Sequence, residues 1–530
     1  MFAIKNTPLQ EAGVLHKIIA DYITGNESLK PFYDHYPDKK GFNDFFESNN
    51  YSLNREELFS ILSLQSSSVE NTSDATRKNI ELLKTNTSYT VTTGHQLCLF
   101  TGPLYVIYKI FSAINLAEEL NTLFPGKKFI PVYWAATEDH DFEEINHFNA
   151  FGKTVTWESA QKGAVGNFKT KELETAFVAA KEIFGNSDNG HFLTELFENA
   201  YLKHSTLAAA TRFLVNTLFG SYGLVTVDGN DKLFKSQFKK HFKKDIFDNI
   251  AFEKVNCSIE QLKEKGYEAQ VNPRPINCFY IEPELRARVE KEGEVFKVVG
   301  TDKTFTAEEL HKLIENESEK ISPNVVLRPL YQQTILPNIA YVGGPGELAY
   351  WLEYKDMFVE FNVIFPVLVP RTFVTIIEKN VKSKIDKLGF EISDLAKDEQ
   401  ELIRLFQVKS DILFELDTQK ESVLNLYKSI AEKIEGVDKT LTGAVNAEHQ
   451  KVLNGLDTIV GKANRALKQK SETEINQLKA VKEKLFPNKI PQERFDNFSG
   501  VYIRFGDSLM KALKENIHPL SFQHVSVIEE

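Results

Sequence analysis

The sequence predicts an α/β protein in which a Rossmann-like, doubly wound core precedes an antiparallel α-helical coiled-coil domain. Between residues 86 and 373, short apolar runs alternate with helical patterns, as expected for a parallel sheet covered by helices. Several of these runs are apolar on both faces, which is typical of strands that lie between two helical layers. From about Thr375 to Phe486 the sequence changes to a proline-free block rich in Lys, Glu and Gln.

The individual elements of the core follow from this alternation. Residues 1–85 are predicted to be helical, with polar breaks near residues 26–28 and 66–68. The expected strands are Tyr89–Thr93, Phe129–Ala136, Leu224–Val227, Cys278–Ile281, Val325–Leu327, Ile339–Val342 and Phe365–Val369. The expected helices include Leu104–Leu120, Thr206–Phe219 and Gly346–Phe358.

The proline-free block is predicted to form a helical hairpin. Apolar residues recur every three or four positions over most of residues 423–441 and again over 453–467. Between them Gly436 offers a turn, with Asp438 as the N-cap of the second helix. One long helix without a turn remains the alternative. We therefore divide the chain into an N-terminal helical part of the core (1–85), the Rossmann-like α/β core with its connecting segments (86–373), the coiled-coil domain (374–487) and a tail that packs on the core (488–530).

Composition narrows the class of protein. The 530 residues include 63 Lys and Arg against 74 Asp and Glu, a net charge of −11, which argues against a general nucleic-acid binder. Three scattered cysteines are too few for a disulfide framework or a cysteine-rich zinc site. The N-terminus lacks the apolar core of a signal peptide, and no apolar stretch is long enough to span a bilayer. We expect a cytoplasmic protein with no membrane partner.

Polar residues and glycines follow almost every predicted strand. Because parallel strands end at one edge of a sheet, these residues are expected to line one cleft. The candidate residues are Gly94, His95, Gln96, Thr101 and Gly102 after the first strand, Glu138, Asp139, His140 and Asp141 after the second, and Arg328, Gln332, Gly343, Gly344, Gly346, Glu347 and Arg371 after the last three.

The run from Thr137 to Asp141 is dense in ionisable groups. It is suited to binding an ammonium group, positioning a polyol or moving protons, with His140 titrating near neutrality. Its alternative is a polar loop that caps the next helix. His140, Glu144 and His147 share one helical face, but no metal-binding signature supports a metal site, and we predict none.

The remaining motifs each allow two interpretations. Gly94, His95 and Gln96 suit hydrogen bonding to a phosphate or an activated acyl group, although His95 could be a buried structural histidine. Cys98 is more consistent with a buried structural thiol than with a nucleophile. The Gly343–Glu347 loop could cradle oxygens through backbone amides, but it is neither a Walker A loop nor a dinucleotide fingerprint. Arg328 and Arg371 suit a carboxylate or phosphate, or else surface ion pairs.

Taken in order, these motifs resemble the bacillithiol-biosynthesis cysteine-adding enzymes over most of the chain. The resemblance rests on Thr93–Gln96 with Phe100–Tyr105 and Lys109, on Pro131–Trp134 with Glu138–Asp141, on Arg328-Pro329, on Gly343–Glu347, and on Val369–Arg371 before a coiled coil. It implies a carbon–nitrogen bond-forming ligase that joins L-cysteine to the amine of glucosaminyl-malate. It also implies a homodimer supported by the coiled coil.

The resemblance suggests roles for the candidate residues. Arg328 and Arg371 would bind malate carboxylates, and Asp139, Asp141, Gln96 and Gln332 the sugar hydroxyls. His95 or His140 would deprotonate the amine, so the catalytic candidates are His95, His140 and Asp139. ATP is the expected activating cosubstrate, making this a nucleotide-binding protein, although no lysine-rich synthetase loop is evident. The alternatives are a nucleotide-sugar-dependent glycosyltransferase and a non-catalytic, ligand-binding coiled-coil dimer.

Overall fold

The computed structural model describes residues 1–410 and 413–530, which divide into two compact units. The first unit comprises residues 1–376 and 492–527, and the second comprises residues 377–491 and 528–530. The chain therefore leaves the first unit after Ile376 and returns to it at Gln492. Each unit is described by itself.

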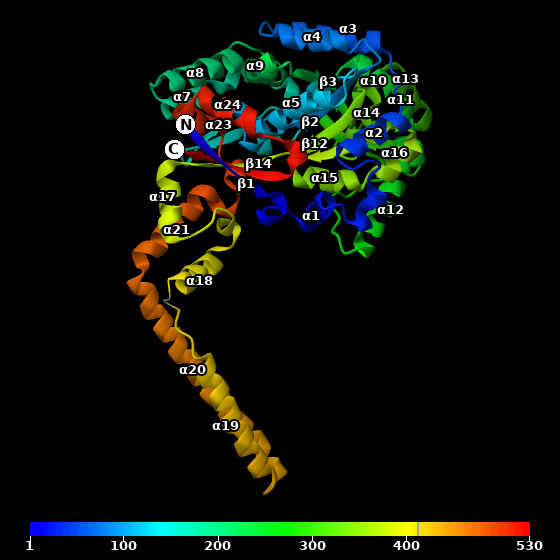
Figure 1. Cartoon of the computed structure of the whole chain (residues 1–530). Coiled ribbons are helices and arrows are strands. Elements are labelled where there is room, and N and C mark those ends of the chain that lie inside the picture. Colours follow the sequence, from blue (N-terminus) through cyan, green and yellow to red (C-terminus); the bar gives the residue numbers. More distant parts are fainter. Residues whose placement is uncertain (411–412) are drawn as a thin grey trace. The chain divides into compact units, whose positions relative to one another are not determined.

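A five-stranded, wholly parallel sheet forms the centre of the first unit (Figure 1). Its strands, in spatial order, are β13 (Val367–Pro370), β12 (Asn338–Gly343), β2 (Ser88–His95), β3 (Lys128–Ala135) and β6 (Val225–Asp228). All five correspond to predicted strands. The chain passes from β2 to β3 and β6 on one side and later adds β12 on the other, so the strand order reverses between β2 and β12.

Both faces of this sheet are buried, as its apolar strands predict. Along β3, Val132 and Trp134 enter one hydrophobic core, whereas Tyr133 and Ala135 enter another. Helix α5 (Tyr105–Leu123) packs on β2 and β3. This helix confirms the expected Leu104–Leu120 helix within a few residues.

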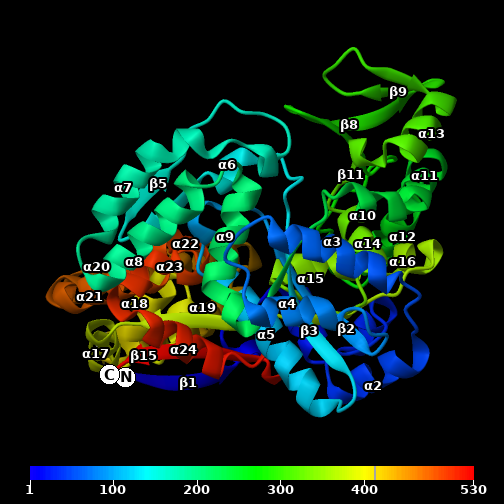
Figure 2. The same ribbon diagram turned by 90° about the horizontal axis from the view of Figure 1, so that it is seen from above.

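A second five-stranded sheet is antiparallel and differs from the expectation (Figure 2). Its strands, in spatial order, are β10 (Thr304–Thr306), β9 (Val295–Val298), β8 (Leu285–Glu292), β7 (Cys278–Glu282) and β11 (Ile321–Pro323). The predicted strand Cys278–Ile281 exists, but it belongs to this sheet. The predicted strand Val325–Leu327 was wrong: Asn324 Oδ1 accepts from the Val326 and Leu327 amides (2.8 and 3.3 Å) and starts a helix there.

The remaining elements of the first unit surround these sheets. Residues 1–85 form helices joined by turns, with one strand at Phe2–Pro8, and the predicted helix Gly346–Phe358 is interrupted at Glu353 and Tyr354. The helices are α1 (Lys17–Ile23), α2 (Lys39–Ser48), α3 (Arg55–Ser67), α4 (Asp74–Leu82), α6 (Phe142–Ile145), α7 (Glu174–Phe184), α8 (Asp188–Phe197), α9 (Leu207–Phe219), α10 (Lys232–Gln237), α11 (Lys239–Asp248), α12 (Ile250–Glu264), α13 (Ala307–Asn316), α14 (Leu327–Ile335), α15 (Pro345–Leu352), α16 (Lys355–Phe361), α22 (Gln492–Phe495), α23 (Phe498–Phe505) and α24 (Asp507–Asn516). The other strands are β1 (Phe2–Pro8), β15 (Gln523–Glu529) and β14 (Phe373–Ile377), which form one sheet, and the hairpin β4 (His147–Ala150) and β5 (Lys153–Thr156).

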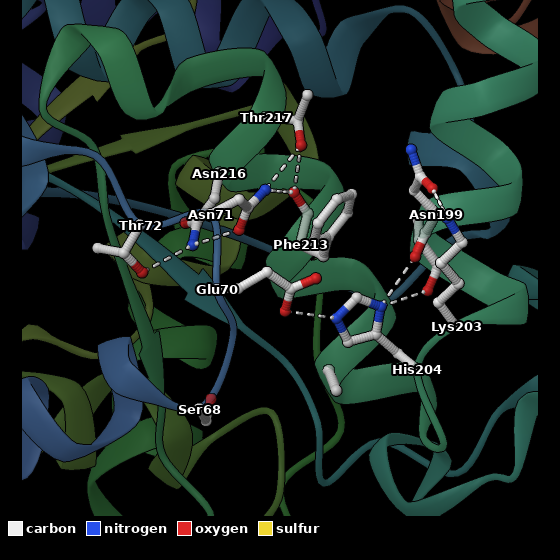
Figure 3. A network of polar contacts seen from close by, with 12 residues as sticks. Ser68, Glu70, Asn71, Thr72, Asn199, Lys203, His204, Phe213, Asn216 and Thr217 are labelled. Carbon is white, nitrogen blue, oxygen red and sulfur yellow. Dashed lines mark hydrogen bonds and ion pairs between the residues drawn. The ribbon is translucent and has the colours of Figure 1, made fainter.

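A polar network fastens the segment between α3 and α4 to α9 (Figure 3). Asn71 Nδ2 donates to the Phe213 carbonyl (2.8 Å) and the Thr217 hydroxyl (2.7 Å). Beside it, His204 Nδ1 donates to two carbonyls and its Nε2 lies 3.5 Å from Glu70. Because carbonyls only accept, these bonds place the neutral-ring proton of His204 on Nδ1.

The second unit contains the helices of the proline-free block. They are α17 (Lys379–Leu388), α18 (Glu399–Lys409), α19 (Asp417–Glu435), α20 (Thr442–Lys470) and α21 (Glu472–Leu485). Helices α19 and α20 pack side by side (Figure 1). The expected turn is confirmed: α19 ends at Glu435 with Gly436 as its C-cap, and Asp438 accepts from the Thr440 amide (2.8 Å) before α20 begins. The alternative of one uninterrupted helix is thereby excluded.

Three contacts join the two arms of this hairpin, and the partner recedes along α20 as the position advances along the first arm. They join Phe414, just before α19, to Asn464, Lys420 to Asp457, and the tilted rings of Tyr427 and His449, whose centroids are 5.1 Å apart. Across residues 1–410 and 413–530, no helix combines the length and the apolar character that crossing a bilayer requires.

Candidate functional site

The carboxyl ends of the five parallel strands meet at one edge, as the sequence analysis expected. His95 pairs with Ala135 at the ends of β2 and β3, and Gly343 pairs with Pro370 at the ends of β12 and β13. In open α/β sheets ligands bind outside this edge, at the point where the strand order reverses. That point lies between β2 and β12, so the residues following these two strands are the centre of the candidate site.

An ion pair between a buried lysine and a partly exposed glutamate links β2 to α15, the helix that follows β12. Lys109 of α5, whose side chain is 2% exposed, donates to the Gly94 carbonyl (2.5 Å) and to Glu347 Oε2 (2.7 Å). Burial alone would raise the pKa of Glu347, but the Lys109 ammonium and further hydrogen bonds hold it at about 2. Glu347 is therefore ionised and compensates the buried ammonium.

The same carboxylate closes the glycine-rich loop. Glu347 Oε2 accepts from the Gly344 amide (2.8 Å) and Oε1 accepts from the Tyr341 hydroxyl (2.8 Å). Glu347 therefore already supplies negative charge at the N-terminus of α15, where the loop was considered as a phosphate cradle. A Cβ at Gly343 would lie 2.8 Å from Leu348, whereas one at Gly346 would meet nothing within 4 Å.

Arg371 lies at the edge, but its guanidinium is already paired. Its two terminal nitrogens bind Glu493 at 2.9 and 2.5 Å, and the side chains are 3% and 5% exposed. The ring of Tyr105 lies 5.3 Å from the guanidinium carbon. This bidentate, desolvated pair gives Arg371 an internal partner in the position we expected for a substrate carboxylate.

Arg328 reaches the site from an unexpected element, the first turn of α14. Its guanidinium carbon lies 5.9 Å from the Trp134 ring and 5.6 Å from the Tyr341 ring, over the ends of β3 and β12. Nη1 donates to Gln332 Oε1 (3.1 Å). The buried atoms Arg328 Nη2 and Gln332 Nε2 find no hydrogen-bond partner among the described residues. The Arg328 guanidinium also hydrogen-bonds the Tyr350 hydroxyl, and the two remaining donors lie where an anion or another acceptor can satisfy both.

Across the edge, three side chains from two segments form an acidic cluster. Gln96 Nε2 donates to Asp139 Oδ2 (2.9 Å) and to Glu144 Oε2 (2.8 Å). Burial alone would raise the pKa of Asp139, but hydrogen bonds from the His140 backbone amide (2.7 Å) and from Gln96 hold it well below its ordinary value. Two carboxylates held by one amide group can attract a cationic amine.

His140 lies beside this cluster with its tautomer fixed by an arginine. Arg286 Nη1 lies 2.8 Å from His140 Nδ1, and since a guanidinium only donates, Nδ1 accepts. The neutral ring then carries its proton on Nε2. Arg286 also donates to Ser322 Oγ (3.2 Å) and the Pro323 carbonyl (3.1 Å) and stacks on Phe279.

A cavity of about 540 Å³ opens next to His140. It is lined by His140, Asp141, Phe142, Glu143, Asn146, Glu158 and Ser159. Asp141 accepts from the Glu144 amide (3.4 Å) and so also caps the short helix α6. Glu138 instead lies in a buried ion pair with Lys235 (2.5 Å), whose side chain is 0% exposed.

His95, the last residue of β2, is partly buried between Cys98 and Tyr105. Its Nε2 lies 3.4 Å from the Tyr105 hydroxyl and 3.6 Å from Cys98 Sγ. Burial lowers the pKa of His95 to about 3, and the nearby Lys109 ammonium contributes to the shift. Burial raises the pKa of the Cys98 thiol to about 12, so Cys98 stays a neutral thiol, as expected for a structural residue.

The structure adds residues that the sequence analysis did not place in the site. Lys109 was noted only within the resemblance, and its signal was a lysine among the apolar residues of the first two turns of α5. Arg286 and Glu493 come from a different sheet and from the C-terminal segment, and no local pattern marks them. Within the parts of the chain that the structure describes, no three His, Cys, Asp or Glu side chains converge as metal ligands.

Fold and site together define a Rossmann-like α/β protein with a charged crevice at the switch point of its sheet and a separate helical unit. Two family models match this division: the N-terminal Rossmann-like domain of bacillithiol biosynthesis BshC over residues 2–372, and the C-terminal coiled-coil domain of BshC over residues 374–529. The chain belongs to this family.

Relatives align over nearly the whole chain. Proteins named "Putative cysteine ligase BshC" from Flavobacterium psychrophilum and Flavobacterium johnsoniae are 42% and 40% identical. The alignments cover 97% of both chains in the first case, and 96% of this chain and 97% of the relative in the second. A protein of the same name from Bacillus cereus is 28% identical over 95% of each chain.

Proposed function

We propose that this protein is a ligase that forms an amide bond between the carboxyl group of L-cysteine and the amine of glucosaminyl-malate. Family membership and the printed names of the relatives support cysteine ligation within bacillithiol biosynthesis. The observation that carries the proposal is the pairing, at one sheet edge, of an anion site around Arg328 with an acidic cluster around Asp139. A substrate that carries both carboxylates and an amine needs both.

Arg328 is proposed to bind a malate carboxylate. Its Nη2 and the Nε2 of Gln332 are buried donors without partners among the described residues, whereas Arg371 is saturated by Glu493. A carboxylate satisfies two such donors at once, and charge-assisted hydrogen bonds are the stronger kind. The malate role therefore falls to Arg328.

The acidic cluster is proposed to hold the amino sugar. Asp139 and Glu144 suit an ammonium, and the cavity beside His140 offers carboxylates and amides for hydroxyl groups. Binding as the ammonium must be followed by loss of a proton, because only the neutral amine attacks an acyl carbon.

The proton is proposed to pass to His95. This ring is neutral over the whole physiological range, so it keeps a lone pair. Because its pKa is low, His95 is a weak base, so it accepts the proton that becomes acidic once the neutral amine has bonded to the acyl carbon. His140 presents an N–H at Nε2 and therefore suits stabilisation of developing negative charge on the acyl oxygen.

ATP is proposed as the activating cosubstrate. Arg286 suits a phosphate group, because its hydrogen bonds run to neutral partners and no carboxylate forms an ion pair with it among the described residues. The Gly343–Glu347 loop suits phosphate less well, because the Gly344 amide already donates to the Glu347 carboxylate. Bound ATP would supply a phosphate-activated cysteine carboxyl.

We propose that α19 and α20 form an antiparallel coiled coil within one chain. We also propose that the exposed apolar side chains of this hairpin join two copies of the chain. The three contacts between the arms support the antiparallel pairing, because the partners recede from Asn464 to His449 as the positions advance from Phe414 to Tyr427. No residue of α19 is buried, and Leu426 and Ile459 are 58% and 53% exposed. The molar mass of the chain and of a Leu426→Glu, Ile459→Glu variant in solution tests it: we expect a dimer that the variant loses.

The experiment that tests the function is a reaction of the purified protein with glucosaminyl-malate, L-cysteine and ATP, omitting each in turn, read by mass spectrometry. We expect a thiol product that contains both substrates and requires all three components. Product without ATP would refute the activation step alone. Transfer from a nucleotide sugar, or tight binding of glucosaminyl-malate with no product, would refute the ligase.

A further inference from the structure

The loop that follows β2 has an unusual backbone. Phe100, Thr101 and Gly102 have φ values of 48°, 69° and 66°, three consecutive residues in the left-handed half of conformational space. Glycine tolerates this, but a β-branched residue such as threonine does so only under constraint. Something outside the loop must hold it, and Phe100 is packed among buried aromatic rings at 0% exposure.

Asn497 supplies that constraint from almost 400 positions further along the chain. Its Nδ2 donates to the Phe100 carbonyl (2.7 Å) and to the Gly102 carbonyl (2.5 Å), on either side of Thr101. Its Oδ1 accepts from the Ser499 amide (2.9 Å) and caps α23. The side chain is 0% exposed, so the hydrogen bonds are sheltered from water.

The loop conformation reaches the site through Cys98. Gly102 lies so close to Cys98 that a Cβ at Gly102 would be 2.6 Å from Cys98 Cβ and 3.2 Å from Sγ. The Cys98 thiol in turn lies 3.6 Å from His95 Nε2. A change in the carbonyl positions of the loop therefore moves the thiol that borders His95.

We propose that Asn497 is a positioning residue: by clamping both carbonyls of the strained loop, it holds Cys98 against His95 and so fixes His95 at the sheet edge. The expected effect on turnover rests on the proposed function. The effect of Asn497 on the loop and on Cys98 does not rest on it, and the experiment measures the two effects separately.

Asn497→Asp is the test, because it keeps the oxygen that caps α23 but faces the two carbonyls with a second acceptor. Asn497→Ser keeps an acceptor without the repulsion, and it is measured as well in case the aspartate variant does not fold. Asn54→Asp is the matched control, since Asn54 caps α3 through its Oδ1 far from the loop in sequence.

The readout is alkylation of the native thiols, followed residue by residue by mass spectrometry. Cys257 is exposed and reacts in every variant, whereas Cys98 and Cys278 are buried. We expect the Asn497 variants to raise the Cys98 rate roughly 10- to 100-fold, the effect of losing a buried polar clamp, with the Cys278 rate unchanged. The Asn54 control should change neither rate.

Two results would overturn the clamp. One is an unchanged Cys98 rate in both Asn497 variants; the other is an equal rise at Cys98 and Cys278, which indicates general destabilisation. In the ligase reaction, the variants should lower kcat roughly tenfold or more with little change in KM for glucosaminyl-malate. If the wild type makes no product, the proposed function fails while the alkylation result still decides the clamp.

Discussion

Replacing Arg371 by methionine removes one half of a buried ion pair and leaves the Glu493 carboxylate without its bidentate partner. Both side chains are at most 5% exposed, so water cannot take the place of the guanidinium. Breaking such a pair from one side costs about 3–5 kcal/mol. The unfolding entropy is about 2.1 cal/mol/K per residue, and the first unit has roughly 400 residues. The expected loss in Tm is therefore about 4–6 °C.

The assay is thermal unfolding of Arg371→Met, Glu493→Met and the double variant. We expect each single variant to lose several degrees and the double variant to recover most of the loss, because no buried charge is then unpaired. Lys312→Met is the matched control, since its pair with Glu308 is exposed at 67% and 79% and is worth less than about 1 kcal/mol. Single variants with wild-type Tm, or a double variant as unstable as the singles combined, would refute a structural role for Arg371.

Three further predictions test the site. Arg328→Met should raise KM for glucosaminyl-malate about 10- to 100-fold in steady-state kinetics and leave Tm nearly unchanged, the reverse of Arg371→Met; an unchanged KM would count against the anion site. Because the pKa of Glu347 is about 2 when folded and near 4.5 when unfolded, its contribution, up to about 3 kcal/mol, is complete above pH 4.5 and is lost as pH falls toward 2. Thermal unfolding at graded pH should thus show a shallower acid dependence in Glu347→Gln, and equal slopes would contradict this. Gly229→Ala should cost about 1–3 kcal/mol, because its Cβ would lie 2.4 Å from the Trp134 ring, whereas Gly346→Ala, with nothing within 4 Å, should cost nothing measurable in urea unfolding.

The sequence predicts the central sheet well because each of its strands is a short apolar run followed by glycine or polar residues. That pattern also places His95, Asp139 and Gly344 at one edge without knowledge of the strand order. It fails for Val325–Leu327, where three apolar residues suggest a strand. There the Asn324 side chain caps the following helix instead, so local hydrogen bonding outweighs apolar character.

The ion-pair partners and hydrogen-bonding roles of the charged residues cannot be predicted from local sequence patterns. Arg328 and Arg371 look alike in the sequence, each in an Arg–Pro or Pro–Arg pair at an element end. They differ because Glu493, 122 positions after Arg371, returns to the core and neutralises only one of them. Likewise, the sequence predicts His140 as a base, but in the structure Arg286 of the antiparallel sheet donates a hydrogen bond to its Nδ1. Such assignments depend on long-range packing that no periodicity encodes.

The most direct test of the account is a crystal structure with glucosaminyl-malate bound. We predict a malate carboxylate within about 3 Å of Arg328 Nη2 and Gln332 Nε2, with the amino sugar toward Asp139 and the Arg371–Glu493 pair intact. A ligand that displaces Glu493 to bind Arg371, or that lies away from the carboxyl edge of the parallel sheet, would contradict it.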